Sequence, residues 1–300
     1  MRFFRLAKFA IAVSGLLMAV SAVLLVVPGP RLSIEFTGGT LMEFALSENA
    51  TRDQLMAGIR TFDATLGEAT TVSATRTGTA LVRTSTLSNE QHTALVAQLQ
   101  KDVGELRELQ FTTIGPTVGA SLKRRSVIAL ALASAAIVLY LAVMFRSMPR
   151  GISSWSFGIA AIAALIHDIL ITVGIFSILS HTTSFQMDTL FVTALLSIMG
   201  YSVNDTIVIF DRVRDNLLIE GKRREFPSLA AESLAQSLRR TLSTGTGALI
   251  MLFALFFLAS ESIRWFTLTL IVGTIIGTYS SFFVATPLVV FWQERRKAGR

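Results

Sequence analysis

The stretch FAIAVSGLLMAVSAVLLVV, residues 9–27, contains 19 residues and no charged side chain. At about 1.5 Å per residue, a helix of this length crosses the hydrocarbon core of a bilayer, which is about 30 Å thick. Arg2, Arg5 and Lys8 precede the stretch, and the sequence VVPGP closes it without the small-x-small site that a signal peptidase needs. We therefore predict an uncleaved first membrane helix with its N-terminus in the cytoplasm.

Five further apolar runs follow after about a hundred residues of mixed polarity, at residues 127–145, 152–179, 190–210, 242–259 and 266–292. The chain is 52% hydrophobic and only 16% charged, whereas soluble domains are about 25% charged. We therefore predict an all-α membrane bundle of six helices. Residues 1–30 form the first helix, 31–122 an outside domain, and 123–300 the other five helices with a cytoplasmic loop at 211–240.

Basic residues distinguish the two sides of the predicted bundle, because short cytoplasmic loops carry an excess of Lys and Arg. The segments assigned to that side contain Arg146, Arg150, Arg212, Arg214, Lys222, Arg223, Arg224, Arg239, Arg240, Arg295, Arg296, Lys297 and Arg300. The short outside loops contain only Arg264. Residues 123–125, Lys-Arg-Arg, oppose the rule but follow a long translocated segment, where the bias is weak. We expect a multi-pass inner-membrane protein with both termini cytoplasmic and one large periplasmic loop.

The outside segment reads as one compact domain. Strand, helix, strand, strand, helix and strand follow one another at residues 41–46, 51–62, 70–76, 79–84, 88–103 and 106–114. Thr51 with Gln54, and Ser88 with Gln91, have the spacing of capping boxes, which mark the start of each helix. This order predicts a periplasmic α+β domain of ferredoxin-like fold, about 75 residues long, with one sheet face open.

The cytoplasmic loop at residues 211–240 is not expected to form a domain. Pro227 begins a short helix with an apolar stripe at Ala231, Leu234, Ala235 and Leu238. Such a helix suits the membrane surface, where residues 222–224, Lys-Arg-Arg, would meet anionic lipid. Alternatively, these three cations form a solvated run of charges.

The composition excludes several classes of site. The absence of cysteine rules out disulfides, thiol catalysis and cysteine-based metal sites. His92, His167 and His181 are widely spaced and form no HExxH motif, so we expect no metal and no cofactor. The net charge of +7 is explained by topology and lipid contact, and we expect no nucleic-acid partner.

Charged residues inside the apolar runs are the main functional candidates, because a charge at the bilayer centre costs about 3 kcal/mol unless it faces protein or water. Asp168 follows His167 near the middle of the third run, and Asp205 follows Asn204 near the cytoplasmic end of the fourth. Arg240 stands at the start of the fifth helix. A carboxylate and a guanidinium at similar depth can form an ion pair that breaks when the carboxylate is protonated. A proton pathway needs such a carboxylate.

These residues also fit roles other than proton transport. Asn204 and Asp205 can join helices by hydrogen bonds alone, and Arg240 can extend to the membrane interface. An intramembrane aspartyl protease would also place two aspartates on neighbouring helices, but its GxGD element is missing. A plain membrane anchor would leave the buried polar residues unexplained. We therefore expect a transport component and no enzyme.

Two motifs outside the apolar runs resemble elements of the SecF family of protein-export subunits. Phe36-Thr37-Gly38-Gly39-Thr40 is similar to the family's Asp-Phe-x-Gly-Gly-Thr element after the first helix, although Glu35 stands where Asp is usual. Gly115-Pro116-Thr117-Val118-Gly119 resembles the element that enters the second helix. We expect structural roles for both motifs.

Three membrane motifs extend the resemblance from the first helix to the last. His167-Asp168-Ile169 is similar to the family's His-Asp pair. YSVNDTIV at residues 201–208, with Asp211-Arg212, resembles its most specific signature, and Arg240-Thr241-Leu242 resembles the start of its fifth helix.

The resemblance implies half of a transporter of the resistance-nodulation-division superfamily. It implies SecD as a partner, work beside the SecYEG translocon and YajC, and use of the proton gradient to help polypeptides cross the inner membrane. Asp205 would carry the proton with Arg240 as its partner, and Asn204, Asp168 and His167 would lie beside them. The alternative is a proton-coupled exporter of small molecules in the same superfamily, but such exporters have larger outside domains and usually twelve helices.

Overall fold

The computed structural model describes residues 2–46, 51–75, 78–146, 152–220 and 223–298. It divides into two compact units. The helical unit comprises Met1–Pro30, Ala129–Ile178 and Leu190–Arg300, and the sheet unit comprises Arg31–Ile128 and Leu179–Thr189. The expected boundary at residue 122 therefore falls inside a helix, and the connection between the third and fourth membrane helices belongs to the sheet unit.

Six spans of the described chain are long and apolar enough to cross a membrane, as the sequence predicts. Five are the single helices α1 (Arg2–Val26), α6 (Pro116–Met144), α7 (Ser154–Thr182), α8 (Thr189–Glu220) and α9 (Phe226–Leu258). The sixth is a continuous run of α10 (Glu261–Ser280), the π-helical turn η1 (Ser281–Ala285) and α11 (Thr286–Ala298).

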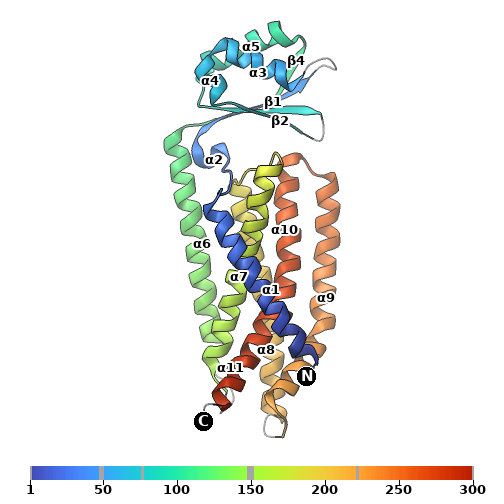
Figure 1. Ribbon diagram of the computed structural model, residues 1–300. Helices are drawn as coiled ribbons and strands as arrows, with labels where there is room; N and C mark the ends of the chain where they lie inside the picture. The colour runs from blue at the N-terminus through green and yellow to red at the C-terminus, as the bar shows by residue number, and fades with distance from the viewer. Residues whose placement is uncertain (1, 47–50, 76–77, 147–151, 221–222, 299–300) are drawn as a thin grey trace. The chain divides into compact units, whose positions relative to one another are not determined.

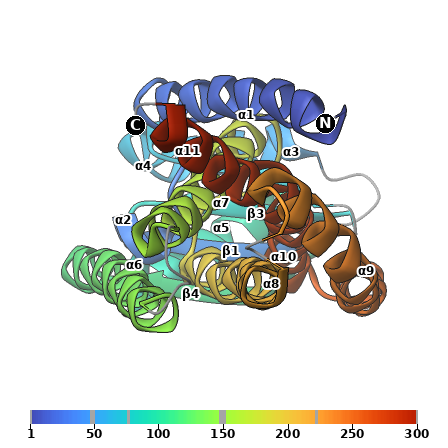
Figure 2. The ribbon, with the colours of Figure 1, turned by 90° about the horizontal axis from the view of Figure 1, so that it is seen from below.

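Three spans form the centre of the helical unit. The apolar windows of α7, α8 and the last span are 56%, 50% and 56% buried, compared with 17% for α1, 6% for α6 and 11% for α9. Figures 1 and 2 show α6 and α9 at the periphery of this unit. The exposed apolar sides of the outer helices are therefore available to lipid or to partner helices.

Both ends of the chain lie at the same end of the helical unit (Figure 1). The ammonium of Lys8 is 5.4 Å from the centroid of the Phe291 ring, and the Phe4 ring is 6.3 Å from the same ring. An even number of spans with both termini on one side agrees with the expected topology. Of the cations counted for that topology, Arg150, Lys222 and Arg300 lie outside the described residues.

The prediction of a separate surface helix in the 211–240 loop was wrong. α8 continues to Glu220 and α9 begins at Phe226, with Pro227 in its first turn, so the expected surface helix is the first part of α9. Its buried residues Phe226, Leu229, Ala230 and Leu234 share a core with Val213 and Leu217 of α8. Of the predicted stripe, Leu234 belongs to this core and Ala231 packs against it, whereas Ala235 and Leu238 are exposed.

The sheet unit has the predicted ferredoxin-like order. The strands are β1 (Gly39–Leu46), β2 (Thr71–Ala74), β3 (Thr79–Thr84) and β4 (Leu106–Ile114), and they form an antiparallel sheet in the order β2-β3-β1-β4. Helices α3 (Arg52–Phe62), α4 (Ala64–Glu68) and α5 (Asn89–Val103) lie against one face (Figure 1). A short helix, α2 (Ile34–Thr37), precedes β1.

Local signals correctly mark the helices of the sheet unit. Both predicted capping boxes form: Thr51 caps α3 together with Gln54, and Ser88 caps α5 together with Gln91. The second sheet face is less open than predicted. Leu81 is only 8% exposed on that face, and Arg83 donates a hydrogen bond to the Ser184 carbonyl of the connection between α7 and α8.

Candidate functional site among the membrane helices

Asp168 lies buried at the centre of the helical unit, where three helices supply its partners. Its Oδ1 is 2.8 Å from Nδ1 of His167, the preceding residue of α7. Its Oδ2 accepts hydrogen bonds from the hydroxyls of Ser202 on α8 and Ser280 on α10, the latter at 2.9 Å. A carboxylate with this many polar partners is held firmly in place.

The other ring edge of His167 is less well satisfied. Its Nε2 is buried and has no hydrogen-bond partner among the described residues. The imidazole stacks against Tyr279 of α10 with ring centroids 6.1 Å apart. The Tyr279 hydroxyl lies 3.2 Å from Ser14 Oγ and donates to the Ala10 carbonyl at 3.2 Å, so the polar network extends to α1.

Asp205 is also buried, with 2% of its surface exposed, but it has much weaker support. Among the described residues, its one side-chain hydrogen bond comes from Thr278 Oγ1 at 3.4 Å, which is long for a hydroxyl donor. In the part of the chain that the structure describes, no cation lies within ion-pair distance of Asp205. A charge in this position is less well compensated than the charge on Asp168.

The structure does not bring Arg240 and Asp205 together as an ion pair. Arg240 lies within α9 rather than at its start, and its side chain is exposed. The next residue, Thr241, is buried instead, and its hydroxyl lacks a hydrogen-bond partner among the described residues.

The contacts between α8 and α9 nevertheless place Arg240 near the depth of Asp205. A Cβ atom at Gly245 would lie 3.1 Å from the Tyr201 hydroxyl, which fixes the level of one helix against the other. Because the two helices run in opposite directions, four residues further along α8 corresponds to four residues back along α9. That step leads from Tyr201 to Asp205 and from Gly245 to Thr241, beside Arg240.

Asn204 is not part of the buried network. It is exposed on the outer side of α8, in line with the small residues Ser197 and Gly200, which are also exposed. Spacings of three and four residues put these side chains on one face of the helix. The sequence places Asn204 correctly beside Asp205, but the helical turn directs the two side chains to different surroundings.

The sequence reasoning missed the polar run Thr278-Tyr279-Ser280-Ser281 in the last span. Thr278 of this run donates to Asp205, and Ser280 donates to Asp168. In addition, Ser281 Oγ lies 2.9 Å from Thr206 Oγ1 of α8. This run leads directly into η1, and π-helical turns within α-helices are frequent at functional sites. Four consecutive polar residues within an apolar span are the signal that could have identified it.

Two glycines allow the last span to approach α8 closely. A Cβ atom at Gly273 would lie 2.1 Å from Cδ1 of Ile198, and one at Gly277 would lie 3.0 Å from Cβ of Ser202. The GxxxG spacing therefore serves close helix packing. That packing brings the hydroxyls of the last span within reach of the two aspartates.

The two motifs outside the membrane runs meet in the sheet unit. Gly38 has φ +77°, and a Cβ atom there would lie 2.9 Å from Cα of Pro116. Gly39 has φ +130°, and a Cβ atom there would lie 2.6 Å from the Thr84 carbonyl oxygen. A Cβ atom at Gly119 would lie 2.8 Å from the Gly38 nitrogen. These backbones approach too closely for side chains.

The remaining motif residues have hydrogen bonds or burial that explain them. Phe36 is buried, and Thr40 Oγ1 lies 3.0 Å from Thr113 Oγ1 and accepts from the Leu87 nitrogen at 3.0 Å. Glu35 accepts from both the nitrogen and the hydroxyl of Thr189, at 2.8 and 2.5 Å, so it caps the start of α8. No close contact accounts for Gly115.

The buried polar groups around the two aspartates can hold and pass protons. Among the described residues, no group of three His, Asp or Glu side chains could hold a metal ion. Hydroxyls of Ser202, Thr278 and Ser280 can each donate and accept a hydrogen bond, and carboxylates can take up a proton. The arrangement is therefore suited to proton transfer between helices.

Comparison with known families matches most of the chain. Residues 95–295 match the family described as protein export membrane protein SecD/SecF, C-terminal. Residues 23–50 match the SecD/SecF GG motif, which includes Gly38 and Gly39.

Individual relatives cover nearly the full length. The protein translocase subunit SecF of Desulfurispirillum indicum is 35% identical over 302 residues, covering 98% of this chain and 92% of its own. The protein translocase subunit SecDF of Thermus thermophilus is 33% identical and aligns with 97% of this chain but only 38% of its own length.

Two solved structures share the fold. The crystal structure of SecDF from Thermus thermophilus superposes with a TM-score of 0.87 and 31% identity, over 98% of this chain and 39% of that one. The crystal structure of SecDF in the super-membrane-facing form superposes with a TM-score of 0.71 and 32% identity, and the match covers 99% of this chain and 39% of that one. The chain thus spans about two fifths of the fused proteins.

Proposed function

The chain belongs to the SecD/SecF family of protein export membrane proteins, and we propose that it is the SecF-type half of a proton-driven assembly that helps polypeptides cross the inner membrane. One observation carries the proton part of this proposal. Asp205 is a buried acid whose only side-chain hydrogen bond among the described residues is a long one from Thr278, so its negative charge is poorly compensated in this arrangement.

SecD is the proposed partner in the membrane. In fused relatives, one chain named SecDF contains a region like this chain together with a longer remainder. Transporters of this superfamily are built from two six-helix halves related by an axis along the membrane normal, and this chain supplies six spans. The function of the pair is therefore shared between the two halves.

The exposed side of α8 is the proposed contact for that half. Ser197, Gly200 and Asn204 give this face small and polar side chains, although α8 is an apolar membrane span. Small residues let helices approach closely, and an amide such as that of Asn204 gains more from a hydrogen bond to another helix than from lipid. Lipid alone would not favour this face.

Copurification from a mild detergent tests the partnership. The tagged chain should retain a six-helix partner, and Asn204→Phe should release it because a bulky ring cannot enter a close helix contact. Leu242→Phe, on an exposed site of α9, is the matched control and should retain the partner. Isolation of an active chain with no such partner would contradict the proposal.

The proton mechanism that we propose uses two arrangements of α9. In the arrangement described, Thr241 faces the bundle near the depth of Asp205, and Arg240 faces outward. A turn of about 100° about the axis of α9, which is one residue's step, would bring Arg240 to the side that Thr241 now occupies and would turn Thr241 outward. A charged Asp205 favours the arrangement with Arg240 inward, and a protonated Asp205 favours the one with Thr241 inward.

The membrane potential supplies enough free energy to drive such a change. Each proton that crosses releases about 2.3 kcal/mol per 100 mV. An ion pair made in only one of two arrangements shifts their populations, because only differential interactions bias a two-state equilibrium. Proton entry and exit at Asp205 would therefore move α9 back and forth.

The sheet unit is proposed to contact the emerging polypeptide beside SecYEG and YajC. β4 is an edge strand of the sheet, and its Leu109 side chain is 48% exposed. An extended chain can add to such an edge through backbone hydrogen bonds. Photocrosslinkers along β4 should trap exported chains, and crosslinks to other subunits alone would identify a docking module instead.

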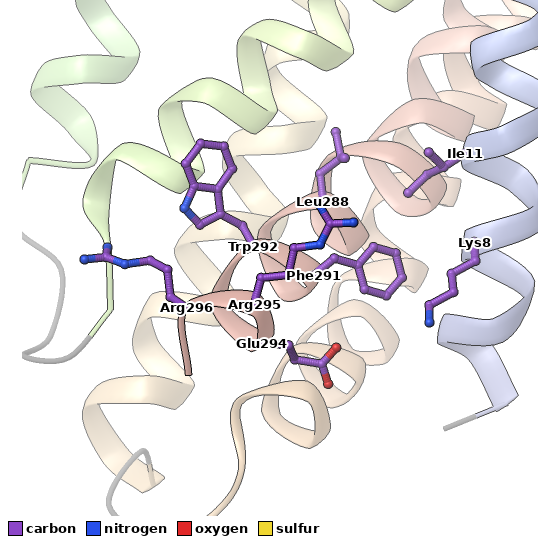
Figure 3. A pocket seen from close by; sticks show the side chains of 8 residues that line it. All are labelled: Lys8, Ile11, Leu288, Phe291, Trp292, Glu294, Arg295 and Arg296. Atoms are coloured by element: carbon purple, nitrogen blue, oxygen red, sulfur yellow. The ribbon is translucent and has the colours of Figure 1, made fainter. Parts of the chain in front are cut away.

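Anionic lipid is proposed to contact the cytoplasmic end of the helical unit. A groove between α1 and α11 is lined by three basic residues, one acid and several apolar side chains. Figure 3 shows them: Lys8, Arg295, Arg296, Glu294, Ile11, Leu288, Phe291 and Trp292. The predicted cluster at residues 222–224 is less suited, because Arg224 pairs with Glu220 at 2.9 Å and with Glu232 at 2.5 Å. Lys222 lies outside the described residues.

A further inference from the structure

The sheet unit contains a polar cavity of about 230 Å³ that the transport proposal does not use. It lies between strands β2 and β3 and the connection that joins α7 to α8. Two arginines, Arg31 and Arg83, line it together with the hydroxyls of Thr71 and Ser73 and the amide of Gln186. No Asp or Glu is among its lining residues.

Strand pairing places these groups on one side of the sheet. Thr71 is paired directly with Arg83, and Ser73 is two residues beyond Thr71 on β2. Residues paired across a ladder, and residues two apart on one strand, share a face. Val72 and Val82 occupy the opposite face, where they join the core beneath the helices. The polar cavity therefore follows from strand alternation.

Arg83 is a cation with an incomplete set of partners. One of its amino groups donates to the Ser184 carbonyl at 3.2 Å, and no carboxylate lies within ion-pair distance in the described chain. Burial lowers the pKa of Arg83, since the charged guanidinium loses water. A guanidinium has five N–H donors, so it retains unused donors as well as an unbalanced charge.

Gln186 and Arg31 offer further side-chain groups to the cavity. The Oε1 atom of Gln186 is buried and has no partner among the described residues, and a half-turn of the amide would present its NH2 group to the cavity. The backbone of Arg31 is fixed, because its carbonyl accepts from the Met187 nitrogen at 2.9 Å and its nitrogen donates to Ser180 Oγ at 3.1 Å. Its side chain is exposed at the cavity.

We propose that this cavity binds a phosphate group, either that of an anionic phospholipid head group or free phosphate. Two guanidinium groups, two hydroxyls and an amide offer donors from several directions, which suits the tetrahedral oxygens of phosphate. Arg31 follows the end of the membrane span α1 at Val26 by only five residues, and Ser180 lies in the last turn of α7. Chain continuity thus places the cavity beside the ends of two membrane spans, where lipid phosphates are abundant.

The full chain, purified in detergent, provides the test. Native mass spectrometry measures retention of dioleoylphosphatidylglycerol against dioleoylglycerol, which has the same acyl chains but no phosphate. A second arm measures the melting temperature against inorganic phosphate, with chloride at equal ionic strength as reference. Arg83→Gln keeps a donor for Ser184 but removes the charge, and Arg107→Gln, exposed on β4 of the same sheet, is the matched control.

We expect Arg83→Gln to weaken phosphate-dependent binding about tenfold or more, the loss typical of one charge-assisted hydrogen bond. Arg107→Gln should bind normally. Binding in the lipid arm alone assigns the site to a head group, and binding in the phosphate arm alone assigns it to the free anion. If Arg83→Gln fails to fold, Arg31→Gln replaces it, because Arg31 is exposed and its substitution does not disturb a buried site. The same loss of phosphate-dependent binding is expected.

Three results would overturn the proposal. In the first, neither probe binds. In the second, Arg83→Gln and Arg31→Gln both bind the probes like the unmodified chain. In the third, a glutamate-rich peptide displaces bound phosphate at a lower concentration than phosphate needs to displace the bound peptide. The last result would show that the cavity takes carboxylates of a polypeptide.

Discussion

The Ser202 hydroxyl of α8 donates a hydrogen bond to Oδ2 of Asp168 on α7. Asp205 lies one turn beyond Ser202 on the same helix, and its only side-chain hydrogen bond within the described chain is 3.4 Å long. Both acids thus lie between α8 and α10, but only Asp168 has three side-chain partners. We infer that Asp168 holds the helices in register and that Asp205 is the acid free to exchange its proton.

Removing a donor from Asp168 should therefore reduce stability more than removing an exposed hydroxyl. Ser202→Ala or Ser280→Ala leaves a buried carboxylate with one partner fewer, which costs about 1–3 kcal/mol. Ser197→Ala, on the exposed side of α8, is the control. The apparent melting temperature of the chain in detergent measures the difference, and equal values for Ser202→Ala and Ser197→Ala would refute the holding role.

Close packing of the last span against α8 should make Gly273 intolerant of a side chain. In Gly273→Ala the new methyl group would overlap Ile198 at 2.1 Å, and overpacking of this kind costs about 1–3 kcal/mol. Gly15→Ala on α1 meets nothing within 4 Å and should be neutral or slightly stabilising. Thermal unfolding compares the two variants, and a Gly273→Ala chain as stable as Gly15→Ala would disprove the close contact.

Arg240→Ala should abolish the gain in export that the proton gradient provides, because α9 would lose the charge that draws it toward Asp205. Arg239→Ala removes the neighbouring exposed cation and should leave that gain intact. Export by reconstituted vesicles, with and without a proton gradient, measures both variants. If Arg239→Ala and Arg240→Ala lose the gain equally, general basicity rather than an ion pair with Asp205 explains the requirement.

Features specified by neighbouring residues could be predicted from the sequence. The capping boxes at Thr51 and Ser88 formed as expected, because each needs only residues three apart. The six spans and the strand order followed from apolar runs and alternation. The lengths of α8 and α9 could not be read in this way, since the stripe that includes Ala231 and Leu234 suits a lipid surface and a helix surface equally well.

The polar network was harder to predict because it depends on which sides of the helices meet. The aspartates were found from their charge, but Thr278 and Ser280 carry none and lie in an apolar run. Asn204 and Asp205 are adjacent in sequence, yet one is exposed and the other is buried. The position of Arg240 depends on the rotation of α9, which hydrophobicity alone does not determine.

Proton-gradient-dependent export by Asp205→Asn is the most direct test of the central claim. The substitution keeps the shape of the side chain but removes its ability to lose a proton, so α9 should stay in one arrangement. We predict that export continues at its gradient-independent rate and no longer responds to the gradient, whereas Asp215→Asn, an exposed acid of α8, responds normally. If Asp205→Asn is expressed, assembles with its partner and still responds to the gradient like the unmodified chain, Asp205 only joins helices and the proposed mechanism is wrong.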